Sequence, residues 1–182
     1  MNDMKGQICL VTGANAGIGK QTALELAQMG ATVVLVARNR ERGEAARAEI
    51  AAGGRAVELL QADFSSPASI RAMTEAFKAR YDRLDVLVNN AGVYLTQREE
   101  TADGLEMTFA VNHLGYFMTT LLLWDRLLAA RSARVVVLSS DAHRQAKLNF
   151  DDLQNERKYA GFSAYSQSKL ANVLFTYELD RR

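Results

Sequence analysis

Apolar runs rich in β-branched residues alternate along this chain with longer segments whose apolar residues recur at helical spacing. Such alternation is typical of βαβ units, in which helices cover both faces of a parallel sheet. The pattern therefore predicts an α/β fold with a doubly wound parallel sheet. Strands are predicted at Ile8 to Thr12, Thr32 to Ala37, Ala56 to Gln61, Asp85 to Asn89 and Arg134 to Ser139. Helices are predicted near residues 17–29, 40–52, 67–80 and 103–130, and from about Ser163 to the end.

The fifth predicted strand, within RVVVLSS at 134–140, is almost continuously apolar. Such a strand suits the interior of a parallel sheet, where it is covered on both faces and paired on both sides. The sequence after residue 140 has a polar loop and one helix but no further strand pattern. An apolar strand left at a sheet edge promotes aggregation. Residues 1–182 are therefore predicted to form a single domain that is truncated at its C-terminus and lacks the strands that would follow.

Composition narrows the function classes. The chain has 182 residues, 48% of them hydrophobic, which suits one globular domain. Its formal net charge is only +1, so the overall charge does not favour binding to nucleic acid or to an anionic membrane. No apolar run reaches the roughly 18 residues that a membrane span needs, and none precedes the first strand as a signal peptide would. These features predict a cytoplasmic protein with no membrane span. The one cysteine, Cys9, excludes an internal disulfide and is predicted to be buried.

A glycine-rich segment, VTGANAGIGK, follows the first strand and opens the first helix. Gly13, Gly17 and Gly19 allow bare backbone to approach a ligand, and the helix N-terminus offers free N–H groups to a pyrophosphate. This is the arrangement of a Rossmann-type dinucleotide site, although the spacing here is G-x-x-x-G-x-G. The alternative is an ordinary tight turn between a strand and a helix.

Gly19 and the lysine that follows it also resemble the end of a P-loop. That motif needs glycine where this chain has Ala14, and serine or threonine where it has Gln21. The segment departs from the P-loop pattern at both positions, so nucleotide hydrolysis is excluded.

The end of the second strand indicates which dinucleotide is bound. A site for NAD places an acidic residue there, on the ribose 2′-hydroxyl, but this chain has Ala37 and Arg38. A guanidinium suits a 2′-phosphate, because it donates planar, charge-assisted hydrogen bonds. The sequence therefore favours NADP(H) over NAD(H). The alternative is that Arg38 is a solvent-exposed arginine at a strand end.

Further motifs follow in order: NNAG at 89–92, two serines at 139–140, and Tyr165-x-x-x-Lys169. Together with the glycine turn, they resemble the short-chain dehydrogenase/reductase family over essentially the whole chain. TGANAGIGK, VNHLG and YSQSKLANVLFT are similar to its retinol-dehydrogenase-like branch. The resemblance implies that residues 1–182 are the dinucleotide-binding and catalytic domain. It also implies a homodimer or homotetramer, because the corresponding helices of the family pair between subunits. The helices at 103–130 and 163–182 are apolar on nearly all sides, as such pairing requires, although missing C-terminal elements would explain part of the same pattern.

The resemblance assigns roles to individual residues. It implies a catalytic tetrad of Asn112, Ser140, Tyr165 and Lys169, in which Ser140 and Tyr165 contact the substrate and Tyr165 and Lys169 also contact the cofactor. It implies cofactor contacts from Gly13, Asn15, Gly17, Ile18, Gly19, Asp63, Phe64, Asn90, Ala91 and Gly92. Arg38 completes the predicted cofactor site.

The chemistry explains why a helix places a phenol and an ammonium side by side. When a hydride moves to or from a carbon that bears oxygen, the oxygen must gain or lose a proton. A phenol ordinarily has a pKa near 10, and a positive charge close by favours its ionised form. Lys169 lies one helical turn after Tyr165 and can supply that charge while it binds ribose hydroxyls. Ser140 would hold the substrate oxygen, and Asn112 would hold a water that links Lys169 to solvent.

The sequence thus predicts an oxidoreductase that transfers a hydride between NADP(H) and a small-molecule alcohol or carbonyl substrate, with Tyr165 as general acid and base. Taken singly, each tetrad residue has a structural alternative: amphipathic packing, a strand end, or a polar side chain bonded to backbone. At the level of the protein, the alternatives are a non-catalytic dinucleotide-binding protein and a purely structural domain. His113 and His143 are too few and too poorly placed to predict a metal site.

Overall fold

The structure is a computed structural model and describes residues 3–182. Five parallel strands form one sheet in the order β3-β2-β1-β4-β5. The strand order reverses beside β1, which pairs with β2 on one side and with β4 on the other. The predicted doubly wound parallel sheet is therefore confirmed. The strands are β1 (Ile8–Thr12), β2 (Thr32–Ala37), β3 (Val57–Gln61), β4 (Val86–Asn89) and β5 (Arg134–Val137).

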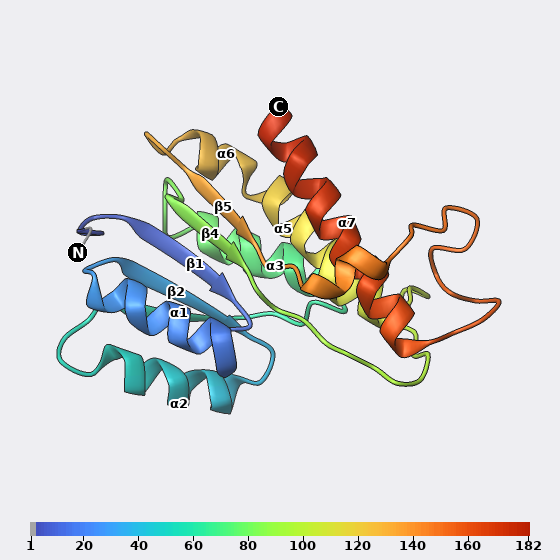
Figure 1. The fold of residues 1–182 in the computed structure, drawn as a ribbon. Helices are drawn as coiled ribbons and strands as arrows, with labels where there is room; N and C mark the ends of the chain where they lie inside the picture. The colour runs from blue at the N-terminus through green and yellow to red at the C-terminus, as the bar shows by residue number, and fades with distance from the viewer. Residues whose placement is uncertain (1–2) are drawn as a thin grey trace.

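Helices lie on both faces of this sheet (Figure 1). On one face are α1 (Gly17–Gln28) and α2 (Arg40–Ala51). On the other face are α3 (Pro67–Lys78) and α5 (Gly115–Leu122), and α7 (Gly161–Arg181) lies next to α5 near β5. Short elements complete the chain: α4 (Met107–Phe109), the π-helical turn η1 (Ala110–Leu114), α6 (Trp124–Leu128) and the 3₁₀ turn η2 (Asp141–Gln145).

The core has two parts because alternate strand residues point to opposite faces of the sheet. Leu10 and Leu87 pack with Phe77 of α3 on one face. Cys9 and Val11 pack against the small residues of α1 on the other. Cys9 is fully buried, as predicted, and burial raises the pKa of its thiol to about 12.

The predicted helix at 103–130 is wrong as a single element. The side chain of Glu106 accepts hydrogen bonds from the backbone N–H groups of Thr108 and Phe109, so the helix begins at 107. It then passes through the π-helical turn η1 and breaks at Leu123, where φ is −100° and ψ is 10°. The apolar pattern predicted one continuous helix, but a polar cap and a local change of helical pitch divide it into shorter elements.

The other boundaries agree with the prediction or differ from it by one or two residues, as is usual for element ends. β5 ends at Val137, and α7 begins at Gly161, ahead of the predicted Ser163. The turn η2 was not predicted, although Ser140 caps it by accepting a hydrogen bond from the backbone N–H of Ala142.

β5 forms one edge of the sheet, and the side chain of Val136 is 46% exposed there. The last helix also carries exposed apolar residues: Leu174 is 45% exposed and Tyr177 is 71% exposed. Within residues 3–182, no helix has the length and apolar character needed to span a membrane.

Candidate active site

The candidate site lies at the carboxyl ends of β1, β4 and β5, beside the point where the strand order reverses. The chain turns sharply after β1, and Gly13 and Gly17 adopt left-handed backbone conformations, with φ of 66° and 54°. A Cβ atom on Gly13 would lie 2.8 Å from the Cα atom of Ala91, and one on Gly19 would overlap the side chain of Asn90. A Cβ atom on Gly17 would have no neighbour within 4 Å. Gly13 and Gly19 thus allow close packing of the protein, whereas Gly17 faces open space.

The NNAG loop is held to the first strand by Thr12, which the sequence analysis missed. The backbone N–H groups of Asn90 and Ala91 donate to Thr12 Oγ1 at 2.8 and 3.0 Å. The side-chain Nδ2 of Asn90 donates to the Thr12 carbonyl at 2.8 Å. The signal for this role was available, because Thr12 is the one hydroxyl residue in the apolar run ICLVT.

A cavity of about 380 Å³ opens between the glycine turn, β2, the segment after β3 and the NNAG loop. Seven predicted cofactor residues line it: Gly13, Asn15, Arg38, Asp63, Phe64, Ala91 and Gly92. Seven others were not predicted: Val36, Ala62, Val93, Leu95, Glu99, Met107 and Val111. Of the remaining predicted residues, Ile18 is 65% exposed, and Gly17, Gly19 and Asn90 belong to the surrounding turn and loop.

Two charged residues, Arg38 and Asp63, line this cavity just after the ends of the paired strands β2 and β3. Arg38 is exposed at the end of β2, and its backbone carbonyl accepts a hydrogen bond from the side chain of Gln61 at 3.0 Å. Asp63 is half-buried, and its Oδ1 atom accepts from the backbone N–H and the hydroxyl of Ser65 at 2.9 and 2.7 Å. The cavity therefore combines an exposed cation with a carboxylate that is held by the following turn.

Tyr165 and Lys169 lie together on α7. The Lys169 Nζ atom is 5.5 Å from the centre of the Tyr165 ring and donates to the Leu138 carbonyl at 3.1 Å. Lys169 is only 3% exposed, and this burial lowers the pKa of its ammonium to about 8. The half-buried ring of Tyr165 packs edge-on against Tyr94, with 5.6 Å between the ring centroids. The structure thus brings the predicted phenol and ammonium into contact.

The two serines after β5 have different partners. The Ser139 hydroxyl donates to the backbone carbonyl of Lys169 at 2.8 Å and so ties the end of β5 to α7. The hydroxyl of Ser140 accepts from the Ala142 N–H at 3.3 Å, at the start of η2. Ser140 therefore precedes a turn, η2, that packs against the helix of Tyr165.

The side chain of Asn112 is bonded to backbone, as its structural alternative predicted. Its Oδ1 accepts from the Val93 N–H at 2.7 Å, and its Nδ2 donates to the Val93 carbonyl at 2.9 Å and to Ser168 at 3.1 Å. The backbone carbonyl of Asn112 accepts from Asn172 at 2.9 Å. Asn112 therefore joins the loop after β4 to α7.

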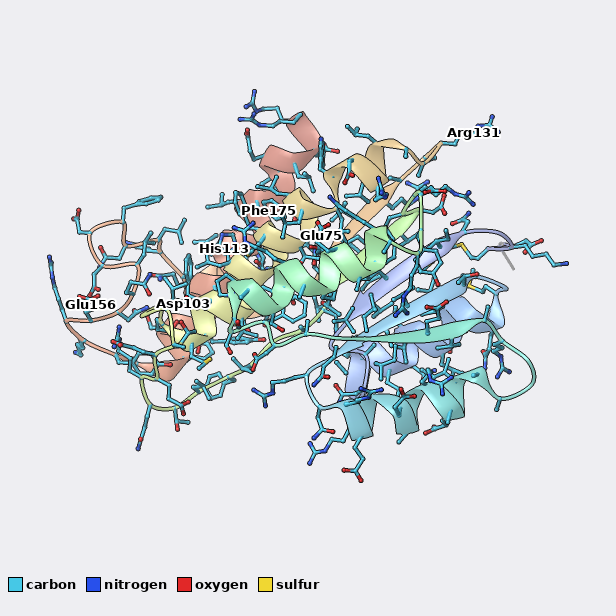
Figure 2. The ribbon with its side chains drawn as sticks, turned by 180° about the vertical axis from the view of Figure 1, so that it is seen from behind. Glu75, Asp103, His113, Arg131, Glu156 and Phe175 are labelled. Atoms are coloured by element: carbon cyan, nitrogen blue, oxygen red, sulfur yellow. The ribbon has the colours of Figure 1, made fainter. Side chains whose placement is uncertain are left out.

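Ser168 and Asn172 were missed by the sequence analysis, although they flank Lys169 as buried polar residues in a helix. Asn172 also donates to the Leu138 carbonyl, which Lys169 shares, and its Oδ1 lies 3.0 Å from His113 Nδ1. Burial lowers the pKa of His113, and its ring lies near Phe175 (Figure 2). No group of three or more metal-ligating side chains occurs in the part of the chain that the structure describes.

Sequence comparisons relate this chain to known proteins. Residues 7–182 match the family model described as short chain dehydrogenase. Retinol dehydrogenase 12 of Mus musculus is 48% identical over 179 residues, which cover 97% of this chain and 57% of that protein. Retinol dehydrogenase 13 of Homo sapiens is 47% identical over 180 residues, covering 97% of this chain and 54% of that protein. The chain thus spans a little over half the length of these relatives.

Solved structures show the same architecture. A crystal structure of an uncharacterised protein from Mycobacterium Paratuberculosis is 40% identical, with a TM-score of 0.90 over 100% of this chain and 64% of that chain. A metagenomic short-chain oxidoreductase in complex with NADP is 31% identical, with a TM-score of 0.80 over 98% of this chain and 77% of that chain.

Proposed function

The chain belongs to the short-chain dehydrogenase family, and from that premise we propose that it transfers a hydride between NADP(H) and an alcohol or carbonyl substrate. Membership confirms the resemblance that the motifs predicted, and the chain is similar to the retinol-dehydrogenase-like branch in particular. One observation carries the proposal. A buried lysine ammonium lies beside the Tyr165 ring, on a helix that packs against β5 and the turn η2 that follows it.

The described residues fit a nicotinamide dinucleotide. The left-handed Gly17 faces open space at the start of α1, where a side chain would obstruct the approach of a ligand to the free N–H groups. Asp63 would accept a hydrogen bond from the adenine amino group, and Asn90, Ala91 and Gly92 would lie along the ribose. When bound, the nicotinamide supplies the hydride or accepts it.

Arg38 supports the choice of NADP(H). Arg38 lines the cavity at the end of β2, and no acidic residue occupies the adjacent position, Ala37. A 2′-phosphate offers this guanidinium a charge-assisted hydrogen bond that a 2′-hydroxyl cannot match. A related solved structure is a complex with NADP, which supports the same choice.

Tyr165 would give the substrate oxygen its proton in reduction and take it in oxidation. The Lys169 ammonium would favour the phenolate during this exchange, and its remaining N–H groups would bind ribose hydroxyls. Ser140 would hold the substrate oxygen through its hydroxyl. The side chain of Asn112 is bonded to Val93, so any contribution to a proton path would come through the position of its backbone carbonyl.

The relatives named retinol dehydrogenases suggest an apolar primary alcohol, or the corresponding aldehyde, as one substrate to assay. The alternative function is a protein that binds the dinucleotide without turnover. The intact set of Ser140, Tyr165 and Lys169 favours the enzyme. We also propose that the protein is cytoplasmic and forms a homodimer or homotetramer, which fractionation and light scattering would test.

Two measurements test the proposed function. Fluorescence titration with NADPH and NADH establishes whether a dinucleotide binds at all, and absence of binding would leave only a structural role. Oxidation of NADPH in the presence of a panel of aldehydes and ketones, retinal included, then separates an enzyme from a non-catalytic binder. We expect saturable NADPH binding and turnover of at least one carbonyl.

A further inference from the structure

Tyr116 is a buried phenol in α5 that the proposed reaction does not use. The residue is 0% exposed, and its hydroxyl has no hydrogen-bond partner among residues 3–182. Burial raises the pKa of this phenol, with a smaller contribution from Tyr165. Because the hydroxyl is unpaired, replacing Tyr116 with phenylalanine removes no bond and is expected to preserve the fold.

The ring of Tyr116 faces the ammonium of Lys169. The Lys169 Nζ atom lies over this ring, 5.7 Å from its centre, and over the Tyr165 ring, 5.5 Å from its centre. Both distances fall within the roughly 6 Å over which an aromatic face attracts a cation. The ammonium is thus flanked by two rings, one from α5 and one from its own helix α7.

The two rings matter because few other groups stabilise the charge of the Lys169 ammonium. Among residues 3–182, Lys169 makes no ion pair and one hydrogen bond from Nζ, to the Leu138 carbonyl at 3.1 Å. The side chain is 3% exposed, and burial lowers its pKa to about 8. The negative face of an aromatic ring favours the charged form and so offsets part of this desolvation.

The charged and titratable groups on neighbouring elements have other partners. In η2, Asp141 and Arg144 pair with each other at 2.7 Å and are 84% and 74% exposed, and His143 contacts the Ser140 carbonyl. In η1, His113 contacts Asn172. The pKa shift of Lys169 has burial as its cause, with no contribution from these groups.

We propose that Tyr116 is a positioning residue, whose ring holds the Lys169 ammonium charged and in place beside Tyr165. The inference rests on the proposed function, in which a charged Lys169 both favours the Tyr165 phenolate and binds the nucleotide ribose. Tyr116 is fully buried and would touch neither the substrate nor the nucleotide. It acts through Lys169, so its effect should appear in the pH range where Lys169 titrates.

The direct test measures the titration of Lys169 by NMR in the unliganded chain, with Lys169→Arg used to assign the signal. Tyr116 is replaced by phenylalanine and, separately, by trifluorophenylalanine, which keeps the ring but removes the negative charge from its face. We expect the pKa of Lys169 to be nearly unchanged in Tyr116→Phe. It should fall by roughly half to one and a half units with the fluorinated ring, the equivalent of one cation–π contact.

Equal pKa values with the two rings would overturn the proposal. Trifluorophenylalanine at Phe77, a buried ring in the core cluster around α3, is the matched control and should leave the Lys169 titration unchanged. Neither nucleotide nor substrate is present, so the result stands even if the proposed function fails.

Nucleotide affinity provides a second readout. With the fluorinated ring, NADPH binding should weaken several-fold near pH 8, where Lys169 loses its charge, and change little near pH 6.5. A merely structural defect would weaken binding equally at both pH values, and that result would also contradict the proposal.

Discussion

The hydroxyl of Ser139 donates a 2.8 Å hydrogen bond to the backbone carbonyl of Lys169, 30 residues later in the chain. This bond joins the end of β5 to the helix that carries Tyr165 and Lys169. It also separates the roles of two adjacent serines, because Ser139 is engaged with backbone while the next residue, Ser140, lies at the start of η2. The sequence motif assigned a role to Ser140 and none to Ser139.

Alanine substitutions of these serines should therefore have different effects. We expect Ser139→Ala to lower the free energy of unfolding by about 0.5–1.5 kcal/mol, the usual net contribution of one hydrogen bond. Ser140→Ala should lower kcat by about a hundredfold, as does the loss of a donor that holds a reacting oxygen. Urea unfolding and steady-state kinetics of both variants measure the two effects. An unchanged kcat in Ser140→Ala would remove this residue from the reaction.

The lowered pKa of Lys169 predicts how the free energy of unfolding depends on pH. Its pKa is about 8 in the folded chain and ordinarily 10.5, so the folded chain binds fewer protons between these values. The free energy of unfolding should rise as the pH rises from about 8 to about 10.5. This gain in stability is lost again as the pH falls through 8. Lys169→Met should therefore be more stable than the wild type at pH 7, by on the order of 3 kcal/mol.

Urea unfolding between pH 7 and pH 10 measures this difference, with the exposed Lys158→Met as the matched control. The advantage of Lys169→Met over the wild type should shrink as the pH rises, and the control should show no such trend. An advantage that stays constant with pH would mean that Lys169 is not the group responsible.

We expect Arg38 to determine the preference for NADPH over NADH. A charge-assisted hydrogen bond contributes about 1.5–3 kcal/mol, so NADPH should bind about ten- to a hundredfold more tightly than NADH. Arg38→Ala should abolish that preference by weakening NADPH binding alone, and the exposed Arg40→Ala is the control. An acidic substitution at Ala37 is a poor test, because Ala37 is 2% exposed and faces Gly43 of α2. If the wild type binds both nucleotides equally, Arg38 points into solvent.

The exposed edge of β5 predicts self-association of the 182-residue chain. Val136 is 46% exposed on this edge strand, and Leu128 of α6 is 69% exposed. A lysine on an edge strand blocks pairing with another copy, so Val136→Lys should reduce the apparent mass measured by light scattering. A wild-type chain that remains monomeric at high concentration would contradict this prediction.

The sequence predicted β1 and β2 to the residue because each is a continuous apolar run between turn signals. It placed the end of β5 too late. Leu138 is apolar like the strand before it, but its carbonyl accepts hydrogen bonds from Lys169 and Asn172 of α7. Contacts between residues more than 30 positions apart are not visible in a local pattern.

Long-range contacts also explain why some site residues were predicted and others were missed. Motif residues such as Gly13 and Tyr165 are identified by their spacing and their neighbours. Thr12 acts on Asn90, 78 residues later, and Ser168 acts on Asn112, 56 residues earlier. Their roles follow from how β1 meets the loop after β4 and how α7 meets η1, which only the folded chain specifies.

The turnover of Tyr165→Phe tests the assignment of Tyr165 as the general acid and base. The substitution removes the hydroxyl that would carry the proton and keeps the ring beside Lys169 and Tyr94. We expect oxidation of NADPH by a carbonyl substrate of the wild type to fall to background, while the dissociation constant for NADPH stays within a few-fold. Near-normal turnover in Tyr165→Phe would contradict the assignment of Tyr165 as the general acid and base.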